Sequence, residues 1–200
     1  MDSRVLKQPL VPASATSQSP RRRLPIGAEV LPVGGGVHFR VWAPKRRSAA
    51  VVLESAQGVG GGAAPVKLTP EAGGYFSAAA PEARAGTRYR FRLDADDRLY
   101  PDPASRFQPN GPHGPSQVVD PSTFTWTDDQ WPGVTPAGQV LYEMHVGTFT
   151  PEGTWDAATR ELEGLKDLGV TCLEVMPVAD FAGRWGWGYD GVNLLSLIHI

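Results

Sequence analysis

Glycine and proline divide residues 26–120 into short stretches, none of which is long enough for an amphipathic helix. The chain has 23 glycines and 19 prolines among 200 residues, and both residue types interrupt regular structure. The stretches between them are rich in β-branched and aromatic residues, which favours strands at residues 37–42, 51–53, 75–78 and 87–93. The pattern predicts an immunoglobulin-like β-sandwich over residues 24–120.

Alternation within two of these stretches predicts which side chains face the core. Val37, Phe39 and Val41 share one face of an extended strand, because successive side chains point to opposite sides. In residues 87–93 the apolar positions alternate with three arginines, which we expect to face water. These arginines are Arg88, Arg90 and Arg92.

The first 23 residues lack apolar periodicity and are rich in serine and proline. Such a segment buries too little apolar surface to offset the entropy of ordering, so residues 1–23 are predicted to be a flexible tail. Arginines 21–23 could contact nucleic acid or lipid, but a run of three is short and is better explained as a solvated linker.

The character of the chain changes after Asp128, which lies within a predicted linker at residues 121–138. Residues 139–146 and 170–175 are strand-like, and Leu162, Leu165 and Leu168 recur at helical spacing between them. Thr154 or Asp156 can cap a helix over residues 156–168, and Gly169 can end it. The strand, helix, strand order favours parallel pairing and resembles the opening of a barrel.

Charge and cysteine content exclude several classes of function. A net charge of −2 and a pI near 6.1 give no long-range attraction for nucleic acid or an acidic membrane surface. No stretch has the length of a signal peptide core or a membrane span. The single cysteine, Cys172, lies in an apolar run and is expected to be a buried thiol in a reducing compartment. We therefore expect a cytoplasmic protein with a neutral ligand and no nucleic-acid or membrane partner.

Aromatic residues cluster after the second predicted strand of the β/α region. Phe181, Trp185, Trp187 and Tyr189 lie within a short stretch, and flat rings can stack on the apolar faces of pyranose sugars. In a parallel barrel this loop would lie at the C-terminal ends of the strands, where active sites form. The stretch therefore predicts a glucan-binding loop.

Other polar residues are weaker candidates for chemistry. Glu143 and Glu174 could be mistaken for the acid pair of a glycosidase, but both lie within predicted strands rather than at their ends, so a structural role is preferred. His38 and His113 are expected on loops or at the surface, without a Cys or His partner at metal-ligand spacing. We expect no metal site, and the family resemblance carried by the segments below implies no organic cofactor.

Three segments carry a family resemblance. "GAEVLPVGGGVHFRVWAP" (residues 27–44) resembles the carbohydrate-binding-module-like domain of branching, debranching and trehalose-releasing enzymes. "YPDPASRFQPNGPHGPSQVVDP" (residues 100–121) is similar to the connector of malto-oligosyltrehalose trehalohydrolases, a family of the alpha-amylase superfamily. Residues 140–193 look like the first βα unit, second strand and following loop of that family's barrel. Branching enzymes usually have Trp-Gly-Tyr-Gln where this chain has Asp190 in fourth place, which favours the trehalohydrolases.

The resemblance implies a β-sandwich followed by the truncated start of a TIM (β/α)8 barrel at residues 139–194. The implied reaction is release of trehalose from maltooligosyltrehalose by cleavage of an alpha-1,4 bond with retention. Tyr189 would lie under the sugar at the cleavage subsite, and Asp190 would assist in binding it. Trp185 and Trp187 are substrate-binding candidates for which a structural role is equally open, and His145 resembles a barrel-lining histidine. A branching enzyme and a non-catalytic glucan-binding module are the alternatives.

The resemblance also implies that the nucleophilic Asp, the acid Glu and an assisting Asp belong to later strands, so no catalytic residue is expected here. A complete barrel needs about 250 residues, and only about sixty follow Val140. Residues 195–200 look like a translated sequencing adapter, which suggests a truncated gene read. We expect the chain as given to hydrolyse no glucan.

Overall fold

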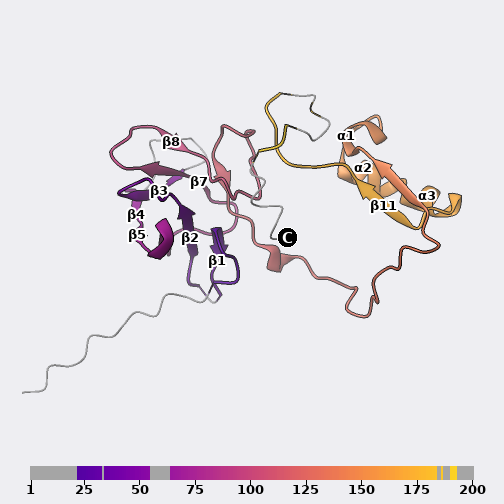
Figure 1. The fold of residues 1–200 in the computed structure, drawn as a ribbon, viewed down its shortest axis with the longest axis horizontal. Coiled ribbons are helices and arrows are strands. Elements are labelled where there is room, and N and C mark those ends of the chain that lie inside the picture. The colour runs from indigo at the N-terminus through magenta and orange to yellow at the C-terminus, as the bar shows by residue number, and fades with distance from the viewer. Residues whose placement is uncertain (1–21, 33, 55–63, 184–185, 187–189, 193–200) are drawn as a thin grey trace, which may run out of the picture.

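The computed structural model describes residues 22–32, 34–54, 64–183, 186 and 190–192. Figure 1 shows a β domain and a smaller β/α unit, joined by an extended segment. The β domain has two sheets. The first has the order β1-β2-β6-β5, with β1 Gly27–Val30, β2 Val37–Trp42, β6 Tyr75–Ala80 and β5 Thr69–Pro70. The second has the order β4-β3-β7-β8, with β9 also paired to β7. Its strands are β4 Val66–Lys67, β3 Ala49–Glu54, β7 Arg88–Leu93, β8 Leu99–Tyr100 and β9 Ser116–Gln117.

The core lies between the two sheets, as the alternation predicts. Phe39 of β2 and Tyr89 of β7 meet edge to face with ring centroids 4.8 Å apart. Val37 and Phe39 are completely buried, and Val41 is nearly so. Burying each such side chain contributes about 1.5–3 kcal/mol, so this interface stabilises the domain. The two-layer β domain predicted from the sequence is confirmed.

The arginines of β7 are less exposed than expected. Arg88, Arg90 and Arg92 are half-buried rather than fully in water. Arg90 Nε lies 2.5 Å from Glu54 Oε1, and the buried Arg92 Nε has no hydrogen-bond partner within the described part of the chain. Val52, which pairs with Arg90 across the two strands, is 7% exposed, and the apolar stems of long arginine side chains can cover such a neighbour.

Two expectations about the start of the domain are wrong. Arg22 was placed in a solvated tail, yet it donates to His38 Nδ1 at 2.7 Å and to the His38 carbonyl at 2.8 Å. His38 was expected on a loop or at the surface, but it lies on β2 with 4% exposure. Buried Glu29 accepts hydrogen bonds from the backbone N–H groups of Arg23 and Leu24. These contacts fasten the segment to the sheet because buried polar groups require partners.

The β/α unit contains two parallel strands, β10 Leu141–Met144 and β11 Cys172–Val175. Parallel pairing is thus confirmed. The segment between them contains α1 Val146–Phe149, α2 Trp155–Arg160 and α3 Leu162–Leu168. Short 3₁₀ turns occur at Ala72–Gly74 and Pro121–Thr123.

The single helix predicted at residues 156–168 is divided at Glu161. The Glu161 N–H bonds to the carbonyls of Ala158 and Thr159, which tightens the turn there. Both predicted ends are correct, since Thr154 caps the Ala157 N–H and Gly169 ends the helix at φ 100°. The strand predicted at residues 139–146 is also shorter, because α1 begins at Val146.

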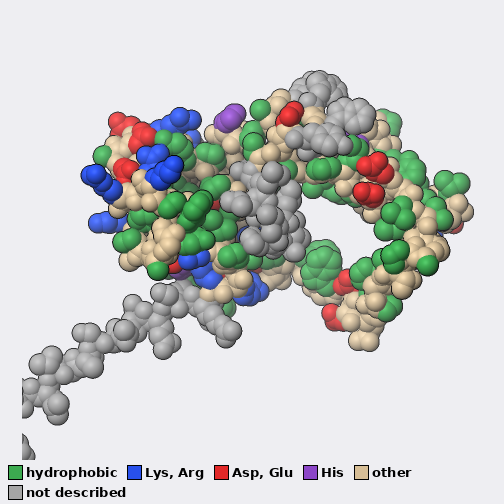
Figure 2. Space-filling view, viewed as in Figure 1, with side chains coloured by type: hydrophobic (Ala, Val, Ile, Leu, Met, Phe, Trp, Pro, Cys, Tyr) green, Lys and Arg blue, Asp and Glu red, His purple; other side chains and the backbone are tan. Residues whose placement is uncertain are grey.

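Apolar side chains of the β/α unit remain largely uncovered. Leu168 is 76% exposed, and only Ala157 and Ala158 are buried within the helices. Cys172 is half-buried, not fully buried as expected. Figure 2 shows hydrophobic side chains over the surface of this unit, whereas Lys and Arg gather on the β domain. Among the described residues, no helix is both long and apolar enough to cross a membrane.

Candidate functional site

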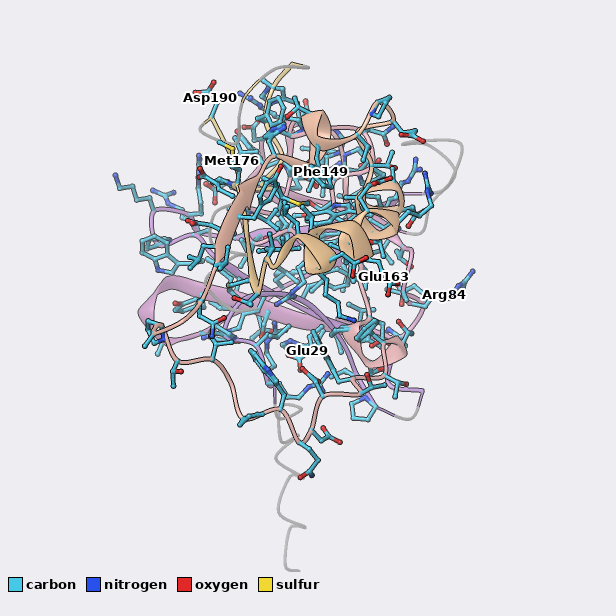
Figure 3. The ribbon with its side chains drawn as sticks, turned by 90° about the vertical axis from the view of Figure 1, so that its right-hand side faces the viewer. Glu29, Arg84, Phe149, Glu163, Met176 and Asp190 are labelled. Carbon is cyan, nitrogen blue, oxygen red and sulfur yellow. The ribbon has the colours of Figure 1, made fainter. Side chains whose placement is uncertain are left out.

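The C-terminal ends of the parallel strands β10 and β11 lie side by side. The backbone N–H of Met176 donates to the Met144 carbonyl at 3.0 Å, which extends the ladder one residue beyond β11. Figure 3 shows Phe149 and Met176 near the strand ends, away from Glu163 on α3, and Figure 1 shows the chain after β11 running toward the β domain. Two loops therefore leave the sheet at the position where barrel enzymes place their chemistry.

The first loop holds a histidine and an aromatic ring. His145 immediately follows Met144, and its carbonyl accepts from the N–H groups of Thr148 and Phe149 at 3.0 and 2.9 Å. The Thr148 hydroxyl lies 3.4 Å from His145 Nδ1. Phe149 meets Tyr142 edge to face at 6.0 Å. These contacts hold the polar side chain of His145 and the apolar ring of Phe149 in one tight turn at the C-terminal end of β10.

The second loop is closed by a backbone hydrogen bond. The Val192 N–H donates to the Asp180 carbonyl at 2.7 Å, so a loop of about a dozen residues begins and ends at one point. Asp190 lies exposed on a turn within the loop. Asp180 is half-buried, and burial raises the pKa of its carboxyl. Sequence reasoning missed Asp180, although a carboxylate five residues after the end of an apolar strand, in the loop that follows it, is a usable signal.

Of the four predicted substrate-binding residues, the structure describes Asp190. Trp185, Trp187 and Tyr189 lie outside the described residues. Gly186, between them, approaches Phe181 so closely that an added Cβ would lie 2.6 Å from its ring. The chain therefore passes directly over a half-buried aromatic side chain on its way to Asp190.

Glu143 and Glu174 face each other across the strand pair, and both are exposed. Each is the third of four residues in its strand, so its side chain leaves the sheet on the face opposite to those of Met144 and Val175 at the strand ends. Within the part of the chain that is described, no three His, Cys, Asp or Glu side chains are grouped to hold a metal ion.

The proline-rich connector is held by one buried carboxylate. Asp102 is completely buried, and it accepts from the Tyr89 hydroxyl at 2.6 Å and the Ala104 N–H at 2.8 Å. Its own N–H donates to the Ser116 hydroxyl at 2.9 Å. Burial raises the pKa of Asp102 despite these bonds. The connector is thus an ordered loop held by side chains, as its prolines suggested.

A cavity of about 410 Å³ lies where the connector, the β domain and the second loop come together. Its walls include Trp42 and Leu93 from the β domain, Tyr100 and His113 from the connector, and Val192 from the loop. Because Val192 is two residues from Asp190, the cavity links the β domain to the candidate site.

Comparisons with known proteins support this arrangement. The family model for carbohydrate-binding module 48, described as the isoamylase N-terminal domain, matches residues 25–120. A malto-oligosyltrehalose trehalohydrolase of Deinococcus radiodurans is 47% identical over 184 residues, covering 92% of this chain and 28% of that protein. The one from Saccharolobus solfataricus is 41% identical over 162 residues, covering 81% of this chain and 27% of that protein.

Solved structures agree on the fold. A Salmonella typhimurium protein described as an alpha amylase has a TM-score of 0.75 and 42% identity, over 86% of this chain and 28% of that one. A pullulanase from Paenibacillus barengoltzii, at 24% identity and a TM-score of 0.68 over 85% of this chain and 31% of that one, shows the fold alone.

The chain combines a two-sheet module with parallel β/α structure, and its relatives have the same combination or are named as glycoside hydrolases. It therefore belongs among the glycoside hydrolases of the alpha-amylase superfamily. More narrowly, the chain belongs to the malto-oligosyltrehalose trehalohydrolase family. It spans 26–28% of the length of the members it matches.

Proposed function

We propose that this protein takes part in releasing trehalose from maltooligosyltrehalose by retaining hydrolysis of an alpha-1,4 bond. Support comes from the 40–47% identity to trehalohydrolases over most of the chain. The observation that carries the proposal is the closed loop that follows β11, on which Asp190 lies exposed. Single Cys172 supports a reducing, cytoplasmic setting for this activity.

The role proposed for this chain is binding and support of substrate. Retaining enzymes need two carboxyls about 5 Å apart that flank the bond. Glu143 and Glu174 are exposed within their strands and do not belong to the loops that follow, so we do not assign them that task. We propose that β10 and β11 are the first strands of a (β/α)8 barrel and that the catalytic acids come from other strands.

Within the loop, the aromatic residues supply stacking and the carboxylate supplies hydrogen bonding. Asp190 is exposed and can accept hydrogen bonds from two sugar hydroxyls, because an ionised carboxylate is an acceptor only. Tyr189 is proposed to lie under the sugar ring at the cleavage subsite. Trp185 and Trp187 would extend the same apolar surface along the glucan.

The test is sugar binding by the purified 200-residue chain, followed by NMR or calorimetry with maltooligosyltrehalose. We expect Asp190→Asn and Tyr189→Ala each to weaken binding by about tenfold, which corresponds to about 1.4 kcal/mol. Glu163→Gln, on α3 away from the strand ends, is the matched charge control and should bind normally. Unchanged binding in both loop variants would refute the assignment, and trehalose release by this chain alone would refute the absence of catalytic acids.

A branching enzyme is the second candidate, because one from Xanthomonas euvesicatoria is 30% identical over 200 residues, covering 92% of this chain and 26% of that enzyme. Iodine staining and branch-point analysis of glucan treated with a full-length relative separate transfer from trehalose release. A non-catalytic glucan-binding module is the third, and firm retention of the β domain on an amylose gel would favour it.

A further inference from the structure

The outer face of the second sheet carries more positive than negative side chains. Arg88, Arg90 and Arg92 point away from the core, and the residues opposite them on β3 are Glu54, Val52 and Ala50. One acidic residue therefore faces three guanidinium groups. Residues 22–120 hold 13 Lys and Arg against 9 Asp and Glu, whereas residues 121–192 hold 3 against 11, so attraction for anions is concentrated on the β domain.

That one carboxylate is already bound. The Glu54 side chain is 4% exposed, and its Oε1 atom lies 2.5 Å from Arg90 Nε. A buried carboxylate held this closely neutralises one arginine and leaves the others. Arg92 is consistent with this surplus, because among the described residues its buried Nε has no hydrogen-bond partner.

At one end of this face lies a hollow of about 460 Å³, lined by Glu54, residues 84–88 and Gln117. Arg84 is exposed and Arg88 is half-buried, and neither forms an ion pair with any described residue. Figure 3 shows Arg84 extending outward from the molecule. Gly86, at φ +86°, has nothing within 4 Å of an added Cβ, so the hollow is open beside it.

We propose that this hollow binds the phosphate group of a small ligand. Planar guanidinium groups match phosphate oxygens in a paired, bidentate geometry, and Arg84 and Arg88 both line the hollow without an ion pair to any described residue. Thr87 and Gln117 add a hydroxyl and an amide to the lining. A neutral glucan would leave both guanidinium charges unneutralised, so phosphate fits the site better.

The hollow is distinct from the candidate glucan site. It is lined by β3, β9 and the turn before β7, whereas the glucan site is formed by the loops after β10 and β11. Free phosphate and a phosphorylated sugar carry the same recognised group. Binding of either ligand would make the occupancy of this hollow depend on the ligand's concentration, at a surface separate from the proposed glucan site.

The experiment titrates the ¹⁵N-labelled 200-residue chain with inorganic phosphate and, separately, with glucose 6-phosphate at constant ionic strength. We expect saturable shifts of the Arg84 and Arg88 Nε–Hε signals and of the Gly86 amide. The Arg84→Gln/Arg88→Gln double variant should bind at least tenfold more weakly. Arg47→Gln, which removes an exposed arginine preceding β3, is the matched control and should bind normally.

Tighter binding of glucose 6-phosphate would identify the ester as the ligand, and equal affinity would identify free phosphate. The absence of saturation with both at about 10 mM, or an equal loss in Arg47→Gln, would overturn the proposal. Neither substitution removes an ion pair described in the structure, so the fold should persist. If the double variant nevertheless unfolds, the exposed Arg84→Gln variant alone decides the result.

Discussion

The β domain and the β/α unit bury their apolar residues to very different extents. In the β domain two sheets cover each other, and Phe39, Tyr89 and Phe91 are at most 1% exposed. In the β/α unit two strands and three short helices leave Leu141 61% and Leu168 76% exposed. Figure 2 shows the same contrast across the molecular surface.

The contrast separates two requirements of folding. Local patterning is sufficient to define a strand or a helix end, as the Thr154 cap and the Gly169 stop show. Closing a core needs a second layer of matching surface, which only the β domain contains among the described residues. Stability is therefore expected to be concentrated in the β domain, and the following substitutions test that difference.

The largest effect is expected from Phe39→Ala. Phe39 is completely buried between the sheets and packs on Tyr89, so truncation leaves a cavity at the centre of the core. The free energy of unfolding should fall by about 3–5 kcal/mol, measured by chemical denaturation with an aromatic fluorescence probe. A loss below about 1 kcal/mol would show that the sheets do not form one cooperative core.

The next largest effect is expected from Asp102→Ala, which tests the attachment of the connector. The substitution leaves the buried Tyr89 hydroxyl and the Ala104 N–H without their acceptor. We expect a loss of about 2–3 kcal/mol and faster hydrogen exchange across the connector. Tyr89→Phe removes one of these bonds and should cost less. If the two variants unfold alike, the other Asp102 contacts contribute nothing measurable.

The sequence alone predicts much of the fold. Strict alternation around Phe39 and Tyr89 identifies the core faces of β2 and β7, because side-chain direction in a strand depends only on position. It fails at His38 and Arg22, which are polar and were assigned to the surface. Their mutual hydrogen bond joins residues 16 positions apart, and residue type gives no sign of such a partner.

The candidate site was predictable only in part. Its place after β11 follows from the strand pattern, and Asp190 is exposed on the loop predicted to carry it. The closing bond from Val192 to Asp180 was not predictable, because backbone hydrogen bonds across a loop leave no trace in residue type. The proposed roles of Trp185, Trp187 and Tyr189 stay predictions.

Gly169→Ala tests whether the helix end stabilises the β/α unit. Gly169 has φ 100° and its N–H bonds to the Lys166 carbonyl, a conformation that an L residue with a Cβ adopts with strain. A loss of about 1 kcal/mol is expected, confined to the β/α unit. Hydrogen exchange should accelerate in α3 and β11 and stay unchanged in β2. Acceleration in both regions would mean that the two parts unfold together.

His38→Gln tests a smaller, pH-dependent contribution in the β domain. Burial, together with the Arg22 charge, lowers the pKa of His38 below the ordinary value of 6.5. The unfolded chain therefore takes up the proton first, so stability is complete above pH 6.5 and is lost as the pH falls below it. Denaturation at about pH 7 and 5.5 should show this loss in the original protein and not in His38→Gln. Exposed His113→Gln should retain the loss, and its disappearance there would contradict the assignment to His38.

The smallest effect is expected from Leu168→Ala, which completes the contrast with Phe39→Ala. Leu168 is 76% exposed at the end of α3, so truncation removes little buried area and creates no cavity. The free energy of unfolding should change by less than about 0.5 kcal/mol, because alanine also favours the helix. A loss above about 1.5 kcal/mol would show that the Leu168 side chain is buried against other apolar residues in solution. The β/α unit would then have a cooperative core of its own, as the β domain has.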